Sequence, residues 1–300
     1  MMGPYSSPPF STFRINPIGV ATRKYSGKKR LVIDLSAPRG SSVPSINSLV
    51  PSSEFSLCYA RVDDAISLIK LLGRGTWLAK ADVVSAFKII PLHPDFWHLF
   101  GVKWRGQFYF AVRLTFGCKS SPKIFDTLAE ALSWILLNVY DVPYVVHLLD
   151  DFLVLDSPSS PPARCITSLT AAFRRLGIPL SSEKTIGPAT SLEFLGISLD
   201  SVSFRASLPH DKLARITEFL SEFLSLRRVT KRQLLSLLGH LNFAYECCPT
   251  RSFLHLSFAA PSLFSLFSLS VNIPGPSLCF RATILVAPPP QMEWHLFLLQ

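Results

Sequence analysis

The chain lacks the cysteine patterns that mark metal sites. No two of its six cysteines form a C-x-x-C pair, and none stands at metal-binding spacing from a histidine. We therefore expect reduced thiols in an intracellular protein of the cytoplasm, the nucleus or both. The first ten residues, MMGPYSSPPF, also lack the charged segment and apolar core of a signal peptide. The cysteines are Cys58, Cys118, Cys165, Cys247, Cys248 and Cys279.

Acidic residues are few. Twenty Asp and Glu stand against thirty Lys and Arg, which gives a formal net charge of +10. That excess favours a polyanionic partner, with nucleic acid as the first candidate, although a basic protein without such a partner is the alternative. Internal repeats are also absent from the sequence. The length of 300 residues and the hydrophobic content of 48% suit one large domain or two to three subdomains.

Charged residues are missing altogether from residues 252–280. The stretch Phe253–Val271 is long enough to span a bilayer, but His255, Pro261 and several serines dilute its hydrophobicity. We therefore expect no membrane association. The absence of a clear period predicts a poorly ordered tail over residues 249–300.

The most informative stretch that the chain does contain is YVVHLLDDFLVLD, from Tyr144 to Asp156. Two β-rich apolar runs flank Asp150 and Asp151, which predicts a hairpin with both acids near its turn. Two neighbouring carboxylates repel each other and lose hydration, and Mg²⁺ would remove that cost because it prefers hard oxygen ligands. An ordinary acidic turn is the alternative. His147, on the first strand, is better explained as a packed histidine than as a ligand.

Another acid lies in an apolar strand. Residues Thr76–Val84, TWLAKADVV, predict a strand that ends near Asp82, and a charged residue in such a strand is either paired or functional. A basic cluster over residues 23–30 precedes a short predicted strand, Leu31–Leu35. That cluster is either a solvated loop or a clamp on phosphates, whose oxygens match the donor fork of arginine.

Amphipathic helices are predicted on both sides of the acidic hairpin. Thr230 and Gln233 form a capping box that starts the last of them. The basic excess between residues 205 and 232 suits a helical pair that lies along a nucleic-acid backbone. Further helices are predicted over residues 60–72, from about Pro122 onward, and over residues 161–176.

Seven segments, in order along the chain, resemble a reverse transcriptase, most closely the polymerase of DIRS-type (tyrosine-recombinase) retrotransposons. The likeness runs from about Gly3 to Glu246, and a weaker likeness follows at EWHLFL near the end of the chain. GPYSSPPF with NPIGVATRK, and then KKRLVIDLSAP, are similar to the N-terminal arm and the fingers motifs. AKADVVSAFKIIPLHP and HLLDDFLV are similar to the two catalytic palm motifs. LTFGCKSSPKIF is similar to the template- and nucleotide-contacting motif, LEFLGI to the primer grip and KRQLLSLLGHLNFA to the thumb.

The resemblance implies an α+β, right-hand polymerase fold with fingers, a palm built of an antiparallel sheet and helices, and a short helical thumb. It divides the chain into an extended arm over residues 1–22, interleaved fingers and palm over 23–203, a thumb over 204–248 and an atypical tail over 249–300. A ribonuclease H domain is expected to be absent, because the chain stops where the family would begin that domain.

The implied activity is RNA-directed DNA synthesis, in which dNTPs are added to a DNA primer on an RNA template. The chemistry would use two Mg²⁺ ions, with Mn²⁺ as a possible substitute. The resemblance assigns Asp82, Asp150 and Asp151 as catalytic carboxylates and metal ligands, with the main-chain carbonyl of Val83 completing the coordination. The alternative is a decayed or repurposed relic that binds nucleic acid without catalysis.

The resemblance also assigns residues around the triphosphate. Arg30 would bind its phosphates, with Lys24 as its partner and Arg23 as the alternative to Lys24. Phe87 would be the steric gate that excludes a ribose 2′-hydroxyl, with simple core packing as the alternative. Lys184 would be a general acid for the leaving pyrophosphate.

The remaining assigned residues lie in two loops. Phe116 and Gly117 would lie near the nucleotide and the templating base, and Leu195 and Gly196 would belong to the primer grip. The sequence departs from the family where it reads LTFGCK instead of LPFGLR, and residues 256–290 do not resemble the family.

Overall fold

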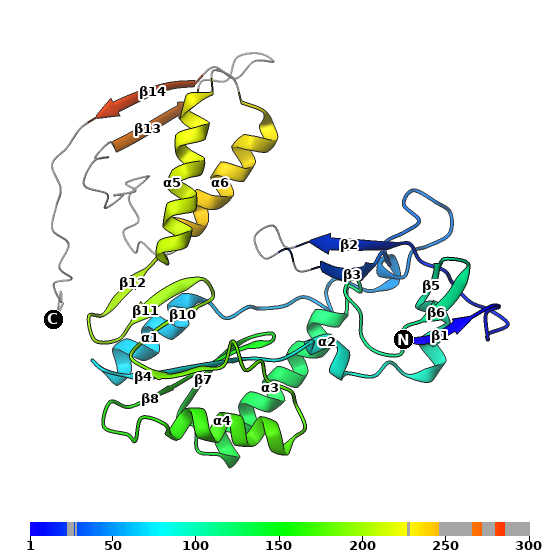
Figure 1. Cartoon of the computed structure of the whole chain (residues 1–300), viewed down its shortest axis with the longest axis horizontal. Coiled ribbons are helices and arrows are strands. Elements are labelled where there is room, and N and C mark those ends of the chain that lie inside the picture. Colours follow the sequence, from blue (N-terminus) through cyan, green and yellow to red (C-terminus); the bar gives the residue numbers. More distant parts are fainter. Residues whose placement is uncertain (23–26, 28, 227–228, 246–265, 272–279, 286–300) are drawn as a thin grey trace. The chain divides into compact units, whose positions relative to one another are not determined.

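The computed structural model describes residues 1–22, 27, 29–226, 229–245, 266–271 and 280–285 (Figure 1). The chain divides into two compact units, Met1–Ala206 and Ser207–Gln300, and each is described by itself. Helices and antiparallel sheets alternate along the chain, which confirms the predicted α+β class.

A four-stranded antiparallel sheet organises the first unit. Its strand order is β7-β8-β4-β9. The predicted acidic hairpin is confirmed as β7 and β8, and β4 runs along the far side of β8. The register of β4 on β8 runs from Trp77 opposite Asp156 to Asp82 opposite Asp151. The strands are β4 (Trp77–Asp82), β7 (Tyr144–Leu148), β8 (Asp151–Asp156) and β9 (Ile186–Ala189).

Helices cover both faces of this sheet (Figure 1). Side chains of a strand alternate between the faces, so Ala79 and Ala81 pack toward α3 (Ser121–Val139) and α4 (Arg164–Arg175). Helix α1 (Val62–Leu72) lies on the opposite face. The predicted helices in these regions are therefore confirmed, with boundaries shifted by a few residues.

A hairpin lies on the same face as α1. It consists of β10 (Ser191–Phe194) and β11 (Ile197–Asp200), which β12 (Arg205–Ser207) extends to a three-stranded sheet. Lys80 reaches it from β4 and donates a hydrogen bond to the carbonyl of Glu193.

The N-terminal part of the first unit contains two further sheets. The residues expected to form an extended arm include β1 (Met2–Tyr5) and β2 (Ile18–Thr22), and both strands pair within these sheets. One sheet has the order β1-β6-β5, and the other pairs β2 with β3. Ile33, Leu35 and Val102 belong to the core of this region. The remaining elements of the first unit are β3 (Lys29–Ile33), η1 (Asn47–Leu49), α2 (Ala86–Ile89), η2 (Pro94–Leu99), β5 (Gly101–Trp104) and β6 (Gln107–Phe110).

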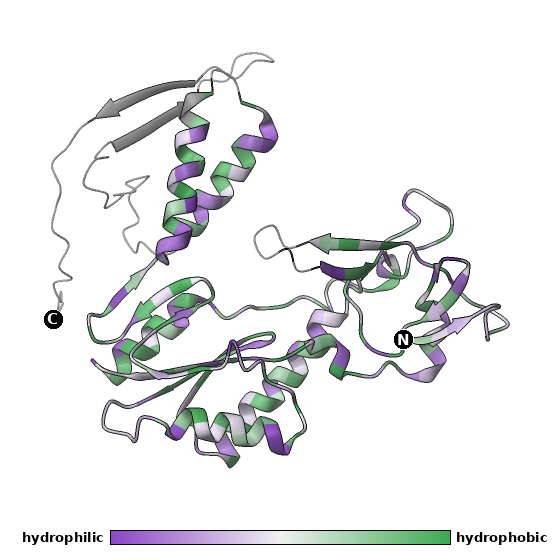
Figure 2. Cartoon of the chain, in the orientation of Figure 1, coloured by the Kyte–Doolittle hydropathy of each residue, from purple (hydrophilic) through white to green (hydrophobic). Residues whose placement is uncertain are grey.

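The second unit is built on α5 (His210–Ser225) and α6 (Lys231–Tyr245). Hydrophobic and hydrophilic residues alternate along both helices (Figure 2). The predicted capping box is confirmed, because the Thr230 amide donates to Gln233 Oε1 at 2.8 Å and the Gln233 amide donates to Thr230 Oγ1 at 3.3 Å.

The tail contains an antiparallel pair, β13 (Leu266–Val271) with β14 (Phe280–Leu285). The rest of residues 249–300 lies outside the described residues, so the expected poor order stays a prediction. No helix in the described part of the chain is long and apolar enough to cross a membrane.

Candidate active site

Strand pairing brings the three predicted carboxylates to one end of the central sheet. Asp82 ends β4 directly opposite Asp151, the first residue of β8. Asp150 lies in the tight turn before β8, where Leu148 pairs with Asp151 and Leu149 adopts a left-handed φ of 52°. The Val83 amide donates to the Asp150 carbonyl at 2.9 Å, which fixes the turn against the end of β4.

Two of the three carboxyl groups have raised pKa values. Burial raises the pKa of Asp150, a backbone hydrogen bond opposes the shift, and the charge of Asp82 adds to it. Burial, together with the charges of Asp150 and Asp82, raises the pKa of Asp151 to about 6. Both shifts have the same physical cause, since like charges that leave water together favour protonation.

Lys184 partly neutralises this cluster. Its ammonium group donates a hydrogen bond to Asp82 Oδ2, although 102 residues separate the two in sequence. The connection is supported by the backbone, because the Ser181 amide donates to the Asp82 carbonyl at 2.9 Å and the Lys184 amide donates to the Ser181 carbonyl at 3.2 Å. The structure therefore brings Lys184 to the predicted carboxylates.

The donor set fits a hard divalent cation. Asp82, Asp150 and Asp151 supply carboxylate oxygens, and the raised pKa values of the last two show negative charge that a cation would stabilise. In the described part of the chain, however, no three His, Cys, Asp or Glu side chains already form a metal-binding group.

Aromatic and cationic residues predicted to bind the nucleotide lie next to one another. The Arg30 guanidinium is 5.2 Å from the centroid of the Phe116 ring, and the Phe116 and Phe87 rings are 5.0 Å apart. The charge of Arg30 also acts on Asp150 and lowers its pKa against the larger effect of burial. Phe87 also packs against Phe125 of α3, with ring centroids 6.1 Å apart, so gate and core packing both remain compatible with its position.

Gly117 has a steric requirement of its own. Its φ is 99°, and a Cβ atom at this position would lie 2.0 Å from the carbonyl oxygen of Ile33. The Ile33 amide donates to the Phe116 carbonyl at 3.2 Å, so the loop lies directly against the end of β3. Only glycine combines this backbone conformation with this close approach.

The departure from the family motif has a local structural consequence. Thr115 stands where the family has proline, and its buried Oγ1 has no hydrogen-bond partner among the described residues. An unpartnered buried hydroxyl group costs about 1–3 kcal/mol. Cys118 stands where the family has leucine and is buried, with Sγ 3.2 Å from Ser120 Oγ.

The other predicted residues lie away from this group or outside the described residues. Leu195 and Gly196 form the turn of the β10–β11 hairpin, with φ values of 48° and 87°. That hairpin is connected to β4 only two residues before Asp82, through Lys80. Lys24 lies outside the described residues, so the structure does not show whether it approaches Arg30.

Asp156, at the opposite end of β8, is not among the site residues predicted from the sequence. Its carboxylate is 1% exposed and accepts hydrogen bonds from Arg164 Nε at 2.7 Å and Arg164 Nη2 at 2.8 Å. Although burial opposes the shift, bonds from Arg164, Ser160 and Cys165 lower its pKa to about 2. In the sequence, the acid at the end of an apolar run was the one sign that Asp156 is paired or functional. The neighbouring sequence did not identify Arg164 or Ser160 as its partners.

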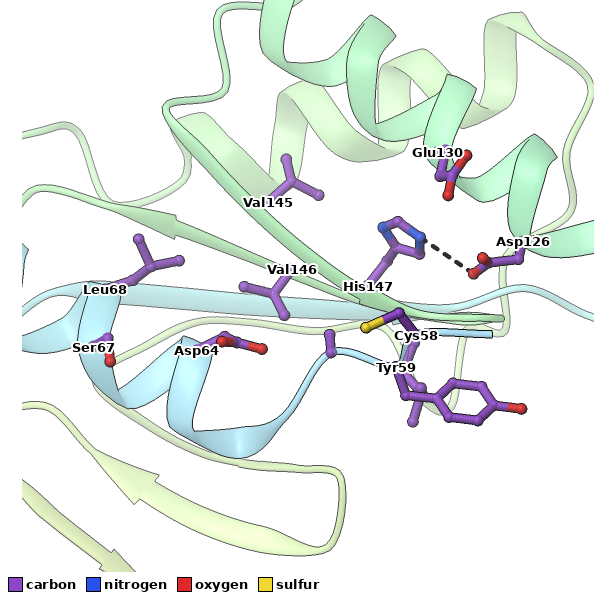
Figure 3. Close-up of a pocket in the computed structure, with 12 residues that line it drawn as sticks. Cys58, Tyr59, Asp64, Ser67, Leu68, Asp126, Glu130, Val145, Val146 and His147 are labelled. Carbon is purple, nitrogen blue, oxygen red and sulfur yellow. Dashed lines mark ion pairs between the residues drawn. The ribbon is translucent and has the colours of Figure 1, made fainter. Parts of the chain in front are cut away.

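A cavity of about 500 Å³ lies between α1, α3 and β7 (Figure 3). Inside it, His147 Nε2 lies 3.6 Å from Asp126 Oδ1, and His147 Nδ1 lies 3.0 Å from Ser133 Oγ. The ring also stacks on Phe152 at 5.6 Å. These contacts agree with the interpretation of His147 as a packed histidine.

Residues 17–199 match the family model described as reverse transcriptase (RNA-dependent DNA polymerase). Viral polyproteins are similar in sequence. The Pro-Pol polyprotein of simian foamy virus type 1 is 22% identical over 230 residues, which are 76% of this chain and 18% of that protein. The Gag-Pro-Pol polyprotein of mouse mammary tumor virus (strain BR6) is 29% identical over 106 residues, which are 34% of this chain and 6% of that protein. The chain thus spans less than a fifth of either relative.

Solved structures of the foamy viral protease-reverse transcriptase have a similar fold. The complex of its dRH form with double-stranded DNA has 22% identity and a TM-score of 0.59, and the match covers 78% of this chain and 37% of that one. The complex with an RNA/DNA hybrid has 20% identity and a TM-score of 0.60, over 78% of this chain and 28% of that one. At this level of identity the likeness establishes the fold.

Proposed function

Because the chain belongs to the reverse transcriptase family, we propose that it is an RNA-directed DNA polymerase that extends a DNA primer on an RNA template. One observation carries the proposal: the ends of β4 and β8 bring Asp82 together with Asp150 and Asp151. The series of motifs further supports a DIRS-type retrotransposon as the source of the enzyme, with copying in the cytoplasm or the nucleus.

The reaction is an in-line phosphoryl transfer, in which the primer 3′-hydroxyl attacks the α-phosphorus of a dNTP and pyrophosphate leaves. Two Mg²⁺ ions, when bound by Asp82, Asp150, Asp151 and the Val83 carbonyl, would stabilise charge on the attacking and leaving oxygens. Mn²⁺ has similar ligand preferences and is a possible substitute.

The neighbouring residues would bind the nucleotide. Arg30 would donate to the triphosphate from its position over Phe116. Phe87 would exclude a ribose 2′-hydroxyl, and Gly117 would allow close approach of the nucleotide. Lys184 would leave Asp82 when a cation is bound and then donate a proton to pyrophosphate.

The two units would have different roles. The first would hold the fingers and palm, and Leu195 with Gly196 would contact the primer from the β10–β11 turn. The basic helical pair α5–α6 would form the thumb, and its Lys and Arg side chains would lie along the nucleic-acid backbone.

Primer extension on an RNA template with Mg²⁺ tests the proposal, with Asp150→Asn compared with the wild type. The substitution preserves side-chain size and removes the charge that would bind the metal. Changes to groups that only support a metal ligand cost about 10–100-fold in activity, so loss of a ligand should reduce extension by at least about 100-fold.

Asp95→Asn is the matched control, because it removes the same charge from a side chain that is 81% exposed. It should extend the primer like the wild type. A folded wild type that binds primer–template but adds no nucleotide would contradict the catalytic proposal, and would favour a relic that only binds nucleic acid.

A further inference from the structure

One asparagine connects two segments that are distant in sequence. Asn47 Nδ2 donates to the Gly117 carbonyl at 2.7 Å, across 70 residues of sequence, and to Ser36 Oγ at 2.8 Å. In return, the Lys119 amide donates to Asn47 Oδ1 at 2.8 Å. A single side chain therefore satisfies backbone groups on both sides of Cys118, in the loop that carries Phe116 and Gly117.

Asn47 is itself held in place. The backbone amide of Asn47 donates to the Leu35 carbonyl at 3.0 Å, so the backbone at Asn47 is fixed to the core just beyond β3. A second link runs in parallel, because Lys119 Nζ donates to the Val50 carbonyl at 2.7 Å and to Ser52 Oγ at 2.8 Å. The segment from Asn47 to Ser52 and the loop around Gly117 thus form one hydrogen-bonded assembly.

The chemistry of the side chain matters here. An amide offers two N–H donors and a carbonyl acceptor, and all three are used. A carboxylate of the same shape retains the acceptor for Lys119 and loses both donors. On the side of Gly117 opposite Asn47, the Ile33 carbonyl occupies the place of a Cβ atom, so the backbone of Gly117 cannot shift in that direction.

We propose that Asn47 is a positioning residue for the nucleotide site, which fixes Gly117 and thereby the Phe116 ring beneath Arg30. The inference rests on the proposed polymerase function and adds to it a residue outside the seven motif segments of the resemblance. Asn47 touches neither nucleotide nor metal, so its removal should weaken dNTP binding more than it slows the chemical step.

The test uses the full chain with Asn47→Ala and Asn47→Asp. Asn138→Ala is the matched control, because Asn138 is exposed and, among the described residues, its side chain donates a hydrogen bond within α3, to the Trp134 carbonyl. Two quantities are measured: KM and kcat for dNTP in primer extension, and hydrogen exchange at the backbone amides of residues 114–121.

Loss of hydrogen bonds at a partly buried site predicts that Asn47→Ala raises KM about three- to tenfold, with kcat changed less than about twofold. Exchange at the Lys119 amide should accelerate. Asn47→Asp should retain protection of that amide and still raise KM, because Gly117 has lost its donor. Asn138→Ala should change neither quantity.

The proposal is overturned if Asn47→Ala lowers the melting temperature while KM stays unchanged, or if Asn138→Ala raises KM to the same extent. An inactive wild type would count against the polymerase function itself. In that case the exchange rates still decide whether Asn47 holds the loop, since they need no activity.

Discussion

Asp151 illustrates how a single residue balances stability against function. Its pKa is raised to about 6 from an ordinary value of 3.8, chiefly by burial and then by the charges of Asp150 and Asp82. The folded state therefore binds the proton more tightly than the unfolded state. The stabilisation from this proton is complete below about pH 4 and is lost as the pH rises through 6.

We expect Asp151→Asn to increase the free energy of unfolding by about 1–3 kcal/mol at pH 8, because the repelled charge is gone. Near pH 4, where the wild-type carboxyl is protonated, the difference should vanish. Urea unfolding at both pH values measures it.

Mg²⁺ provides an internal check on this prediction. A cation that binds only the folded state raises the unfolding midpoint, and it should do so more for the wild type than for Asp151→Asn. If pH changed the free energy of unfolding of both proteins equally, Asp151 would not be the residue whose protonation affects stability.

At the scale of elements, Asp156 joins β8 to α4. Its carboxylate accepts a paired hydrogen bond from Arg164, at the start of the helix, and also bonds to Ser160 Oγ at 2.8 Å. Because α4 packs on the face of the sheet that contains β4 and β8, this junction holds β8 at the end opposite Asp151.

Asp156→Asn should destabilise the fold by about 2–3 kcal/mol at pH 7, since the pKa of about 2 lies below the ordinary 3.8. The sign is opposite to that for Asp151. Here the stabilisation is present above about pH 4 and is lost as the pH falls through 2. Denaturant unfolding between pH 2 and 7 follows the effect.

Asp95→Asn again serves as the control and should leave stability within about 0.5 kcal/mol of the wild type. If Asp156→Asn lost the same stability at pH 2 as at pH 7, its effect would come from packing instead of the charge.

At the scale of the whole molecule, the net charge of +10 predicts salt-dependent binding of nucleic acid. Lys and Arg side chains that neutralise phosphates release the counterions bound to the nucleic acid. The logarithm of the association constant therefore falls linearly with the logarithm of salt concentration. Fluorescence anisotropy with a labelled primer–template, titrated at several KCl concentrations, measures the slope. Affinity that does not change with salt would contradict an electrostatic interface.

Local physical chemistry determined much of this protein from sequence. Runs of β-branched and other apolar residues predicted β4, β7 and β8, and the side-chain complementarity of Thr230 and Gln233 predicted the start of α6. These features depend on neighbours in sequence, so a single sequence reveals them. The order of the motifs predicted the family for the same reason, since each motif is a contiguous segment.

Only the tertiary structure decided the strand register and the hydrogen bonds through which distant residues meet. The register that sets Asp82 opposite Asp151, the bond from Lys184 to Asp82 and the bonds of Asn47 to the Gly117 loop join segments that no periodicity links. The pairing of Asp156 with Arg164 likewise follows from how α4 packs on the sheet. Such contacts depend on the packing of whole elements, and that packing determines which charges are buried and which are paired.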